Sequence, residues 1–166
     1  EPRLVMPFYD ANGQLTGVTC RALGDEKLRY LIVKVKEDTP LIFGLDNHDS
    51  KSHTYVVEGP IDSLFLPNAI AVSGTGFGKL DSLNISKNEM TVVVDNQPRN
   101  KEVCKVIESL IAKDYNVVIW PQMQQEKDIN DLILSGKSKG FVLKLIKENT
   151  HRGLQARAKF MTWRRC

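Results

Sequence analysis

Three short apolar segments, each followed by an acidic residue, constrain the fold of this chain most. The segments are residues 54–57, 91–94 and 116–120. Their valine, isoleucine and aromatic content is typical of parallel strands buried on both faces of a sheet. Glu58 and Asp95 directly follow the first two segments, and Asp128 follows the third after a polar loop. Because open α/β sheets bind ligands at the carboxyl ends of their strands, the pattern predicts an α/β fold with three carboxylates at one edge.

Three carboxylates at one edge would repel one another, and removal from water would add to the cost. A hard divalent cation relieves this repulsion, and Mg²⁺ takes oxygen ligands while retaining waters. The alternative is that Glu58, Asp95 and Asp128 are unrelated acids that cap separate loops and helices. That alternative better explains any one acid alone, whereas three acids in register favour a shared cation site.

The clearest helical pattern lies between the second and third segments. Val103, Ile107, Leu110 and Ile111 form one apolar stripe within residues 98–113. A helix between two parallel strands of one sheet forms a right-handed crossover by strong precedent. Two shorter helices are expected over residues 128–134 and 140–147. In the last of these, the side chains expected to face inward are Phe141, Val142 and Leu145.

The N-terminal region has a different pattern. Residues 3–9 and 14–20 are strand-like and flank a turn with Gly13 where positive φ is favoured. Residues 28–35 can pair beside them, which predicts a small antiparallel β lobe. The polar residues 46–52 are the expected hinge. The expected division is residues 1–50 for this lobe, 51–136 for the central domain and 137–166 for a C-terminal helical basic segment.

Composition excludes several classes of protein. The content of 26% charged and 42% hydrophobic residues is that of an ordinary soluble globular protein. No stretch approaches the length of a membrane span, no signal peptide is visible, and the start at Glu1 favours an excised fragment. The three cysteines form no Cys-x-x-Cys pair, so reduced thiols are expected rather than a zinc ribbon. His48 and His53 lie in a polar loop and are expected to be solvated.

Two further stretches leave alternatives open. Residues 151–166 carry five arginine or lysine side chains and no acid, interleaved with Phe160 and Trp163. This is typical of a solvated helix face, of a surface that contacts phosphates or stacks on bases, or of a docking site. Residues 69–72 form a strand candidate that leads into the glycine-rich residues 73–79. The glycine spacing does not match a phosphate-binding P-loop, so a flexible turn beside the sheet edge is expected.

The acidic motifs carry a resemblance. Glu58-Gly59 with Asp62, then Asp95, then Lys127-Asp128 with Asn130-Asp131 look like the three motifs of the Toprim domain. That domain is shared by bacterial-type primases, topoisomerases and some nucleases. Residues 3–21, 29–31 and 43–45 resemble the segment that precedes Toprim in the RNA polymerase core of primases. Residues 95–102 are similar to the primases of T-even-type phages.

The resemblance implies a fold and a set of roles. The fold would be a mainly parallel Toprim-like sheet flanked by helices, preceded by the antiparallel lobe and followed by C-terminal helices. Mg²⁺ or Mn²⁺ would support nucleotidyl transfer. The residues implied as catalytic and metal-binding are Glu58, Asp95 and Asp128, with Gln97 and Asn130 as further metal ligands. The residues implied to contact nucleic acid or nucleoside triphosphate are Arg3, Arg21, Arg29, Tyr30 and Lys79.

Some positions depart from the family pattern or have two explanations. The second motif usually reads Asp-x-Asp and here has Gln97, and the third often has an acid where Asn130 stands. Both amides offer carbonyl oxygens, but each removes a negative charge, which implies weaker or fewer metals. Asp62 fits the first motif or caps its own helix. Asp131 binds metal through water or caps the helix of residues 128–134.

The resemblance implies a DNA primase catalytic core that makes short RNA primers on single-stranded DNA in replication. Its partners would be the template, ribonucleoside triphosphates and a replicative helicase, in the cytoplasm of a bacterial host, without a membrane. The alternatives are a Toprim-type nuclease or topoisomerase fragment, and a non-catalytic nucleic-acid-binding module of the replisome. A topoisomerase needs a nucleophilic tyrosine in a separate domain, and no tyrosine here shows that role.

Overall fold

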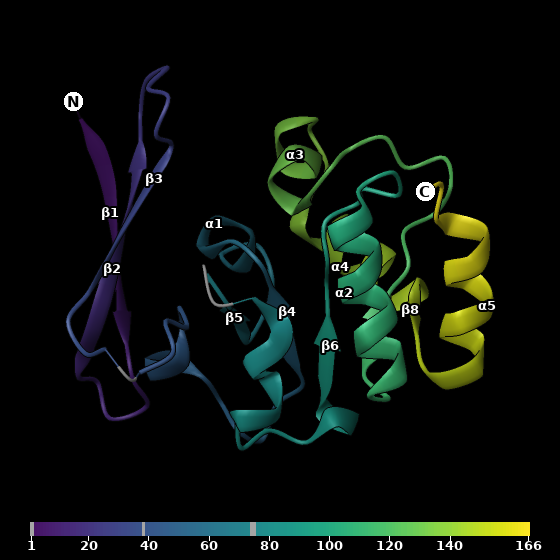
Figure 1. The fold of residues 1–166 in the computed structure, drawn as a ribbon, viewed down its shortest axis with the longest axis horizontal. Helices are drawn as coiled ribbons and strands as arrows, with labels where there is room; N and C mark the ends of the chain where they lie inside the picture. Colours follow the sequence, from purple (N-terminus) through teal and green to yellow (C-terminus); the bar gives the residue numbers. More distant parts are fainter. Residues whose placement is uncertain (1, 38, 74–75) are drawn as a thin grey trace.

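The computed structural model describes residues 2–37, 39–73 and 76–166, and its strands form two sheets (Figure 1). Gly74 and Thr75 of the glycine-rich stretch lie outside the described residues. A three-stranded antiparallel sheet forms the N-terminal lobe, at the left of Figure 1, and a five-stranded sheet with its helices forms the rest. The described chain contains no helix long and apolar enough to cross a bilayer. The expected α/β architecture is confirmed.

The N-terminal sheet has the order β1-β2-β3. Its strands are β1 (Arg3–Tyr9), β2 (Leu15–Ala22) and β3 (Tyr30–Lys34). Gly13, with a φ of 74°, lies in the turn between β1 and β2, as the sequence predicts. The lobe is joined to the central sheet by an antiparallel bridge between Phe43 and Ala71, and the Phe8 ring meets the Phe43 ring edge-on at 6.3 Å. The contact of the chain at Phe43 with the central sheet is thus a single bridge.

The central sheet has the order β5-β4-β6-β7-β8. Its strands are β4 (Thr54–Val57), β5 (Ala69–Ala71), β6 (Met90–Val92), β7 (Asn116–Val118) and β8 (Thr150–His151). β4 pairs in parallel with β5 and β6, and β6 pairs in parallel with β7. The strands followed by the three acids are β4, β6 and β7, and the prediction that they are parallel neighbours is confirmed. β8 pairs antiparallel with β7, so residues 137–166 complete this sheet.

The helices cover the central sheet. The α-helices are α1 (Pro60–Ser63), α2 (Lys101–Ala112), α3 (Ile129–Leu134), α4 (Lys139–Glu148) and α5 (Gly153–Trp163). Short 3₁₀ helices are η1 (Leu45–Asn47), η2 (Phe77–Ser82) and η3 (Lys87–Glu89). α2 packs against β7 and α5, and α3 packs against α4. Together they cover apolar faces that the short strands alone would leave in water.

The buried faces of two helices differ in part from the sequence predictions. On α2, Ile107, Leu110 and Ile111 are buried as expected. Near the start of the helix the buried residue is Cys104, whereas the predicted Val103 is only half-buried. On α4, the prediction that Phe141 faces inward is wrong, because this residue is 45% exposed. The buried α4 residues are Val142 and Ile146. The Phe141 ring instead lies 5.3 Å from the Lys137 ammonium, on the outer side of the helix.

The C-terminal aromatic residues belong to the core. Phe160 and Trp163 of α5 are buried, so the option that they stack on bases is wrong. Their burial follows from the packing of α5 against α2. Cys166, just beyond α5, brings its Sγ to 3.2 Å from the Sγ of Cys104, although the two are distant in sequence. Both are free thiols in the structure.

The polar segment expected as a hinge is tied to the central sheet. The Asn68 side-chain amide donates to the carbonyls of Asp49, Ser52 and His53, at 2.9, 3.0 and 3.3 Å. His53 Nε2 lies 2.9 Å from the Thr91 hydroxyl, and His48 forms a similar contact with Thr54. His53 is exposed, as expected for a solvated side chain, and His48 is half-buried; each ring also contacts the hydroxyl of a strand threonine.

Candidate active site at the carboxyl edge of the central sheet

Each of the three acids reaches the sheet edge through its own local structure. Glu58 follows β4, and Gly59 then turns the chain into α1, with Pro60 in the first helical turn, where its missing N–H costs nothing. Asp95 follows β6 after two more buried valines. Asp128 follows a polar loop after β7 and is the N-cap residue of α3.

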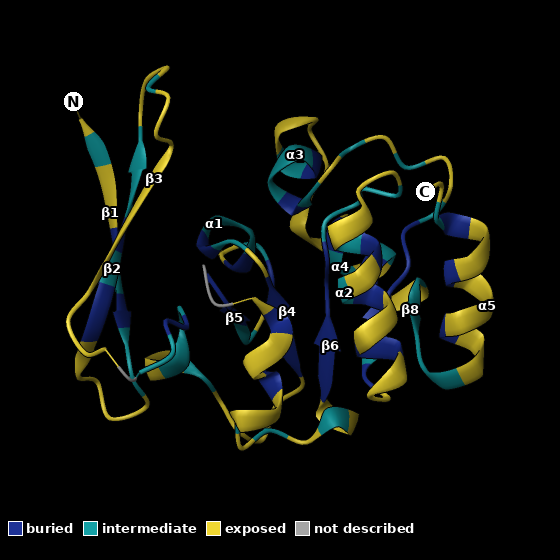
Figure 2. Ribbon diagram, in the orientation of Figure 1, coloured by how far each residue is buried: buried dark blue, intermediate teal, exposed yellow. Residues whose placement is uncertain are grey.

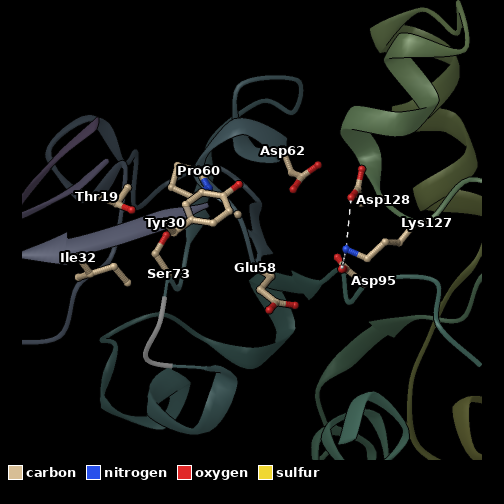
Figure 3. A pocket seen from close by; sticks show the side chains of 11 residues that line it. Thr19, Tyr30, Ile32, Glu58, Pro60, Asp62, Ser73, Asp95, Lys127 and Asp128 are labelled. Carbon is tan, nitrogen blue, oxygen red and sulfur yellow. Dashed lines mark ion pairs between the residues drawn. The ribbon is translucent and has the colours of Figure 1, made fainter. Parts of the chain in front are cut away.

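The acids line a cleft of about 350 Å³ between the two sheets (Figure 3). The lining residues are Thr19, Tyr30, Ile32, Glu58, Gly59, Pro60, Asp62, Ser73, Asp95, Lys127 and Asp128. The N-terminal lobe supplies the wall of Thr19, Tyr30 and Ile32, and the edge of the central sheet supplies the carboxylates. The structure therefore brings Glu58, Asp95 and Asp128 together in one cleft, with Tyr30 opposite them.

Lys127 lies among these carboxylates. Its Nζ is 2.9 Å from Oδ2 of Asp95 and 3.7 Å from Oδ2 of Asp128. The Asp95 and Asp128 side chains are 18% and 20% exposed, whereas the Lys127 side chain is 49% exposed. The lysine thus reaches in from solvent toward two recessed acids, and the charge-assisted contact with Asp95 is the closer one.

The surroundings of the acids change their proton affinities. Burial raises the pKa of Asp62 to about 7, helped by the charges of Asp128 and Asp95 and opposed by a hydrogen bond from the Asn130 N–H. Removal from water also raises the pKa of Glu58, with Asp95 adding to the effect and Lys127 opposing it. The pKa of Asp95 is raised by burial and lowered in part by Lys127. The raised values of all three mark a cleft with excess negative charge.

Asp62 links the first motif to the third, and Asp128 holds the start of α3 within the third. No side chain caps α1, and Asp62 Oδ1 instead accepts a hydrogen bond of 2.8 Å from the backbone N–H of Asn130 in α3. The option that Asp62 caps its own helix is therefore wrong. Asp128 Oδ1 accepts from the Asp131 N–H at 2.8 Å, so Asp128 rather than Asp131 caps α3. Both bonds satisfy free N–H groups at the start of α3.

The two amides that replace family acids do not line the cleft. The Gln97 side-chain oxygen accepts from the Asn100 amide at 2.8 Å, beside a separate polar hollow of about 620 Å³ that Arg99 and Arg165 also border. Asn130 makes its contact with Asp62 through its backbone N–H. Both residues stay candidate ligands from the sequence alone.

The predicted nucleotide-contacting residues are spread over the N-terminal lobe and beyond. Tyr30 lines the cleft, and the Arg21 guanidinium lies 5.7 Å from the centre of its ring. Arg3 donates to the Leu28 carbonyl at 3.0 Å. Arg29 precedes β3, and Lys79 lies in η2; both are exposed and neither lines the cleft. Of these five residues, Tyr30 lines the cleft with the acids, and Arg21 reaches the cleft only through its contact with the Tyr30 ring.

Asn96 is a site residue that the sequence analysis missed. Its N–H donates to the Lys127 carbonyl at 2.6 Å, and its side-chain amide donates to the carbonyls of Gln124 and Glu126 at 2.9 and 3.1 Å. Its Oδ1 accepts from the Trp163 indole N–H at 3.1 Å. Asn96 therefore holds the loop before Asp128 against the end of β6. The only sequence signal is an amide next to a strand-end acid, which is common in turns.

The donor set suits a hard divalent cation, because carboxylate oxygens are the ligands that Mg²⁺ takes. The Lys127 ammonium already shows that Asp95 and Asp128 can share one positive charge. Among the described residues, no three His, Cys, Asp or Glu side chains converge closely enough to coordinate a single ion. The residues therefore fit a metal held by Asp95 and Asp128 with waters, and a larger protein ligand set would need side-chain movement.

The amino-acid sequence has a relative among characterised proteins. The chain is 34% identical to the DNA primase of Enterobacteria phage T4 over 161 residues, which are 95% of this chain and 46% of the phage protein. The chain thus spans about half the length of this relative. No family model matches the chain.

The fold matches solved primase structures. The RNA polymerase domain of the Mycobacterium tuberculosis primase DnaG superposes with a TM-score of 0.68 at 19% identity, over 90% of this chain and 56% of that one. The Escherichia coli primase catalytic core gives a TM-score of 0.64 at 16% identity, over 96% and 55%. A DnaG catalytic domain bound to single-stranded DNA gives 0.62 at 14% identity, over 96% and 54%. The chain therefore has the fold of a primase catalytic core, and the resemblance to T-even phage primases is confirmed over nearly its whole length.

Proposed function

We propose that the chain is the catalytic core of a DNA primase, which makes short RNA primers on single-stranded DNA. The observation that carries this proposal is the meeting of Glu58, Asp95 and Asp128 in one cleft of a primase-like fold. The similarity to the phage T4 primase supports the same reaction. DNA as the template is supported by the primase structures that contain single-stranded or double-stranded DNA.

The cleft suits nucleotidyl transfer from a ribonucleoside triphosphate. Mg²⁺ or Mn²⁺, when bound, would stabilise charge on the transferred phosphate and orient the reacting oxygens. Asp95 and Asp128 would hold that ion through their carboxylates. Glu58, which projects into the same cleft with a raised pKa, accepts the proton of the attacking 3′ hydroxyl or serves as a further ligand. Tyr30, backed by Arg21, forms the opposite wall against which a base or ribose can pack.

The direct test is metal-dependent incorporation of ribonucleotides on a single-stranded template. Glu58→Gln keeps the size of the side chain and removes its charge, and we expect synthesis to fall by roughly 100-fold or more. Glu108→Gln is the matched control, because Glu108 is exposed on α2, away from the cleft. Unaltered synthesis by the Glu58 variant would exclude this residue from the mechanism.

The runner-up is a Toprim-type reaction that cleaves DNA in the same metal site. Tyr115 makes a poor nucleophile because its hydroxyl is bonded to Asp81 at 2.8 Å and its ring is buried. Cleavage of supercoiled or linear DNA without primer synthesis would favour this alternative. A replicative helicase as partner and the cytoplasm of a bacterial host as location follow from the proposed primase function.

A further inference from the structure

A lysine occupies the position in the cleft where a metal would bind. Figure 3 shows the Lys127 side chain between Asp95 and Asp128, with ion pairs to both. These are the two carboxylates to which the proposed function assigns the divalent ion. The contact with Asp95, at 2.9 Å, places the ammonium against Oδ2, an oxygen that a metal on this carboxylate would use.

The fold fixes the base of this lysine. The Lys127 carbonyl accepts the Asn96 N–H at 2.6 Å, and the Asn96 side-chain amide donates to the carbonyls of Gln124 and Glu126 in the loop before it. The backbone at Lys127 is therefore held beside Asp95. The flexible four-carbon stem is half exposed, so the ammonium can swing into solvent without any change in the loop.

The charges of the cleft make this lysine significant. The described lining residues include four carboxylates, of Glu58, Asp62, Asp95 and Asp128, and Lys127 is the one cationic side chain among them. An ammonium that lies a few ångströms from a divalent ion repels it, and low water content strengthens that repulsion. Lys127 therefore stabilises the metal-free cleft and opposes the entry of a metal.

We propose that Lys127 is a resident counter-ion that competes with the divalent cation for Asp95 and Asp128, and so sets the metal affinity of the site. The inference rests on the proposed metal-dependent function and adds a residue that tunes it. When the ion binds, the ammonium leaves Oδ2 of Asp95 and moves outward on its stem. The free energy of metal binding therefore includes the cost of breaking the Asp95–Lys127 ion pair.

Calorimetric titration of the metal-free protein with Mn²⁺ alone tests this. Lys127→Met keeps the length of the side chain and removes its charge, so we expect the Mn²⁺ dissociation constant to fall roughly fivefold or more, given the half-exposed position. Lys127→Arg keeps the charge and should bind Mn²⁺ much as the parent does. Lys113→Met is the matched control, because Lys113 pairs with Asp81 at 2.6 Å outside the cleft, and its Mn²⁺ affinity should be unchanged.

The outcomes separate this inference from the proposed function. If the parent binds Mn²⁺ and Lys127→Met, with an unchanged melting temperature, binds it equally or more weakly, the competition is overturned while the primase function stands. Binding by Lys127→Met alone would support the competition. If neither protein binds Mn²⁺, both the competition and the metal-dependent function are overturned. Loss of primer synthesis in Glu58→Gln addresses the function without reference to Lys127.

Discussion

The two sheets of this protein are stabilised in different ways. All residues of β4 and β6 in the central sheet are buried, whereas all five residues of β3 in the N-terminal sheet are exposed (Figure 2). Helices cover the central sheet, so the backbone of the strands that precede the carboxylates is held in place by packing. The opposite wall of the cleft, with Tyr30 and Ile32, lies on a thinly packed sheet. The acids are thus positioned more firmly than the wall that faces them.

The register of the N-terminal sheet shows how its two faces differ. On the face toward the cleft, Met6, Thr19 and Ile32 lie side by side, and Met6 and Thr19 are buried. On the other face, apolar residues form two cross-strand rows without a charge. The rows are Val5, Cys20 and Leu31, and Pro7, Val18 and Val33. An apolar sheet face that remains in solvent contributes little to stability.

The largest expected difference between the sheets is in stability. Ile70 of β5 is fully buried and Ile32 of β3 is 44% exposed. Ile70→Ala should lower the free energy of unfolding by about 2–5 kcal/mol, because it leaves a cavity in the core. Ile32→Ala, with the same chemical change, should cost about 1 kcal/mol or less. Denaturant titration of both variants measures this contrast, and equal losses would contradict it.

The second prediction concerns the pH dependence caused by Asp62. Its pKa is raised from 3.8 to about 7, so between these values the folded protein holds a proton that the unfolded chain has lost. This group therefore reduces stability as the pH rises from about 4 to about 7. With a chelator present, Asp62→Asn should match the parent near pH 4 and be more stable at pH 8, by on the order of 1–3 kcal/mol.

The control for this effect is Asp25→Asn in the N-terminal lobe. Asp25 is exposed, so its replacement is a surface change that should leave the melting temperature at pH 8 within about a degree of the parent. If the Asp62 variant were less stable than the parent at pH 8, the carboxylate would be a net stabiliser of the α1–α3 contact. That result would contradict the role of burial in raising its pKa.

The smallest expected effect concerns Asn96. Asn96→Ala removes the two amide bonds to the loop and leaves the Trp163 N–H without its acceptor, which should cost about 1–2 kcal/mol. Faster amide hydrogen exchange confined to residues 121–128 would show that the loop is released. Asn12→Ala in the exposed turn between β1 and β2 is the control, with no expected change. Unchanged exchange in the loop would contradict the positioning role.

Local patterns predicted much of the fold, and long-range contacts explain the rest. β1 and β4 have the bounds that the sequence predicts, and Glu58, Asp95 and Asp128 meet because parallel strands share an edge. The error at Phe141 arose because two apolar faces of one helix have similar periodicity and only packing selects between them. The contact of Asn96 with Trp163 joins residues 67 positions apart, which no local pattern reveals.

The central claim is that Asp95 and Asp128, with Glu58 beside them, form a divalent-metal site. A crystal soaked in Mn²⁺ and measured by anomalous scattering tests it most directly. We expect one manganese peak bonded to the Asp95 and Asp128 carboxylates, with the Lys127 ammonium displaced from Asp95. Manganese bound only elsewhere, with the Lys127–Asp95 ion pair intact at saturating Mn²⁺, would contradict it.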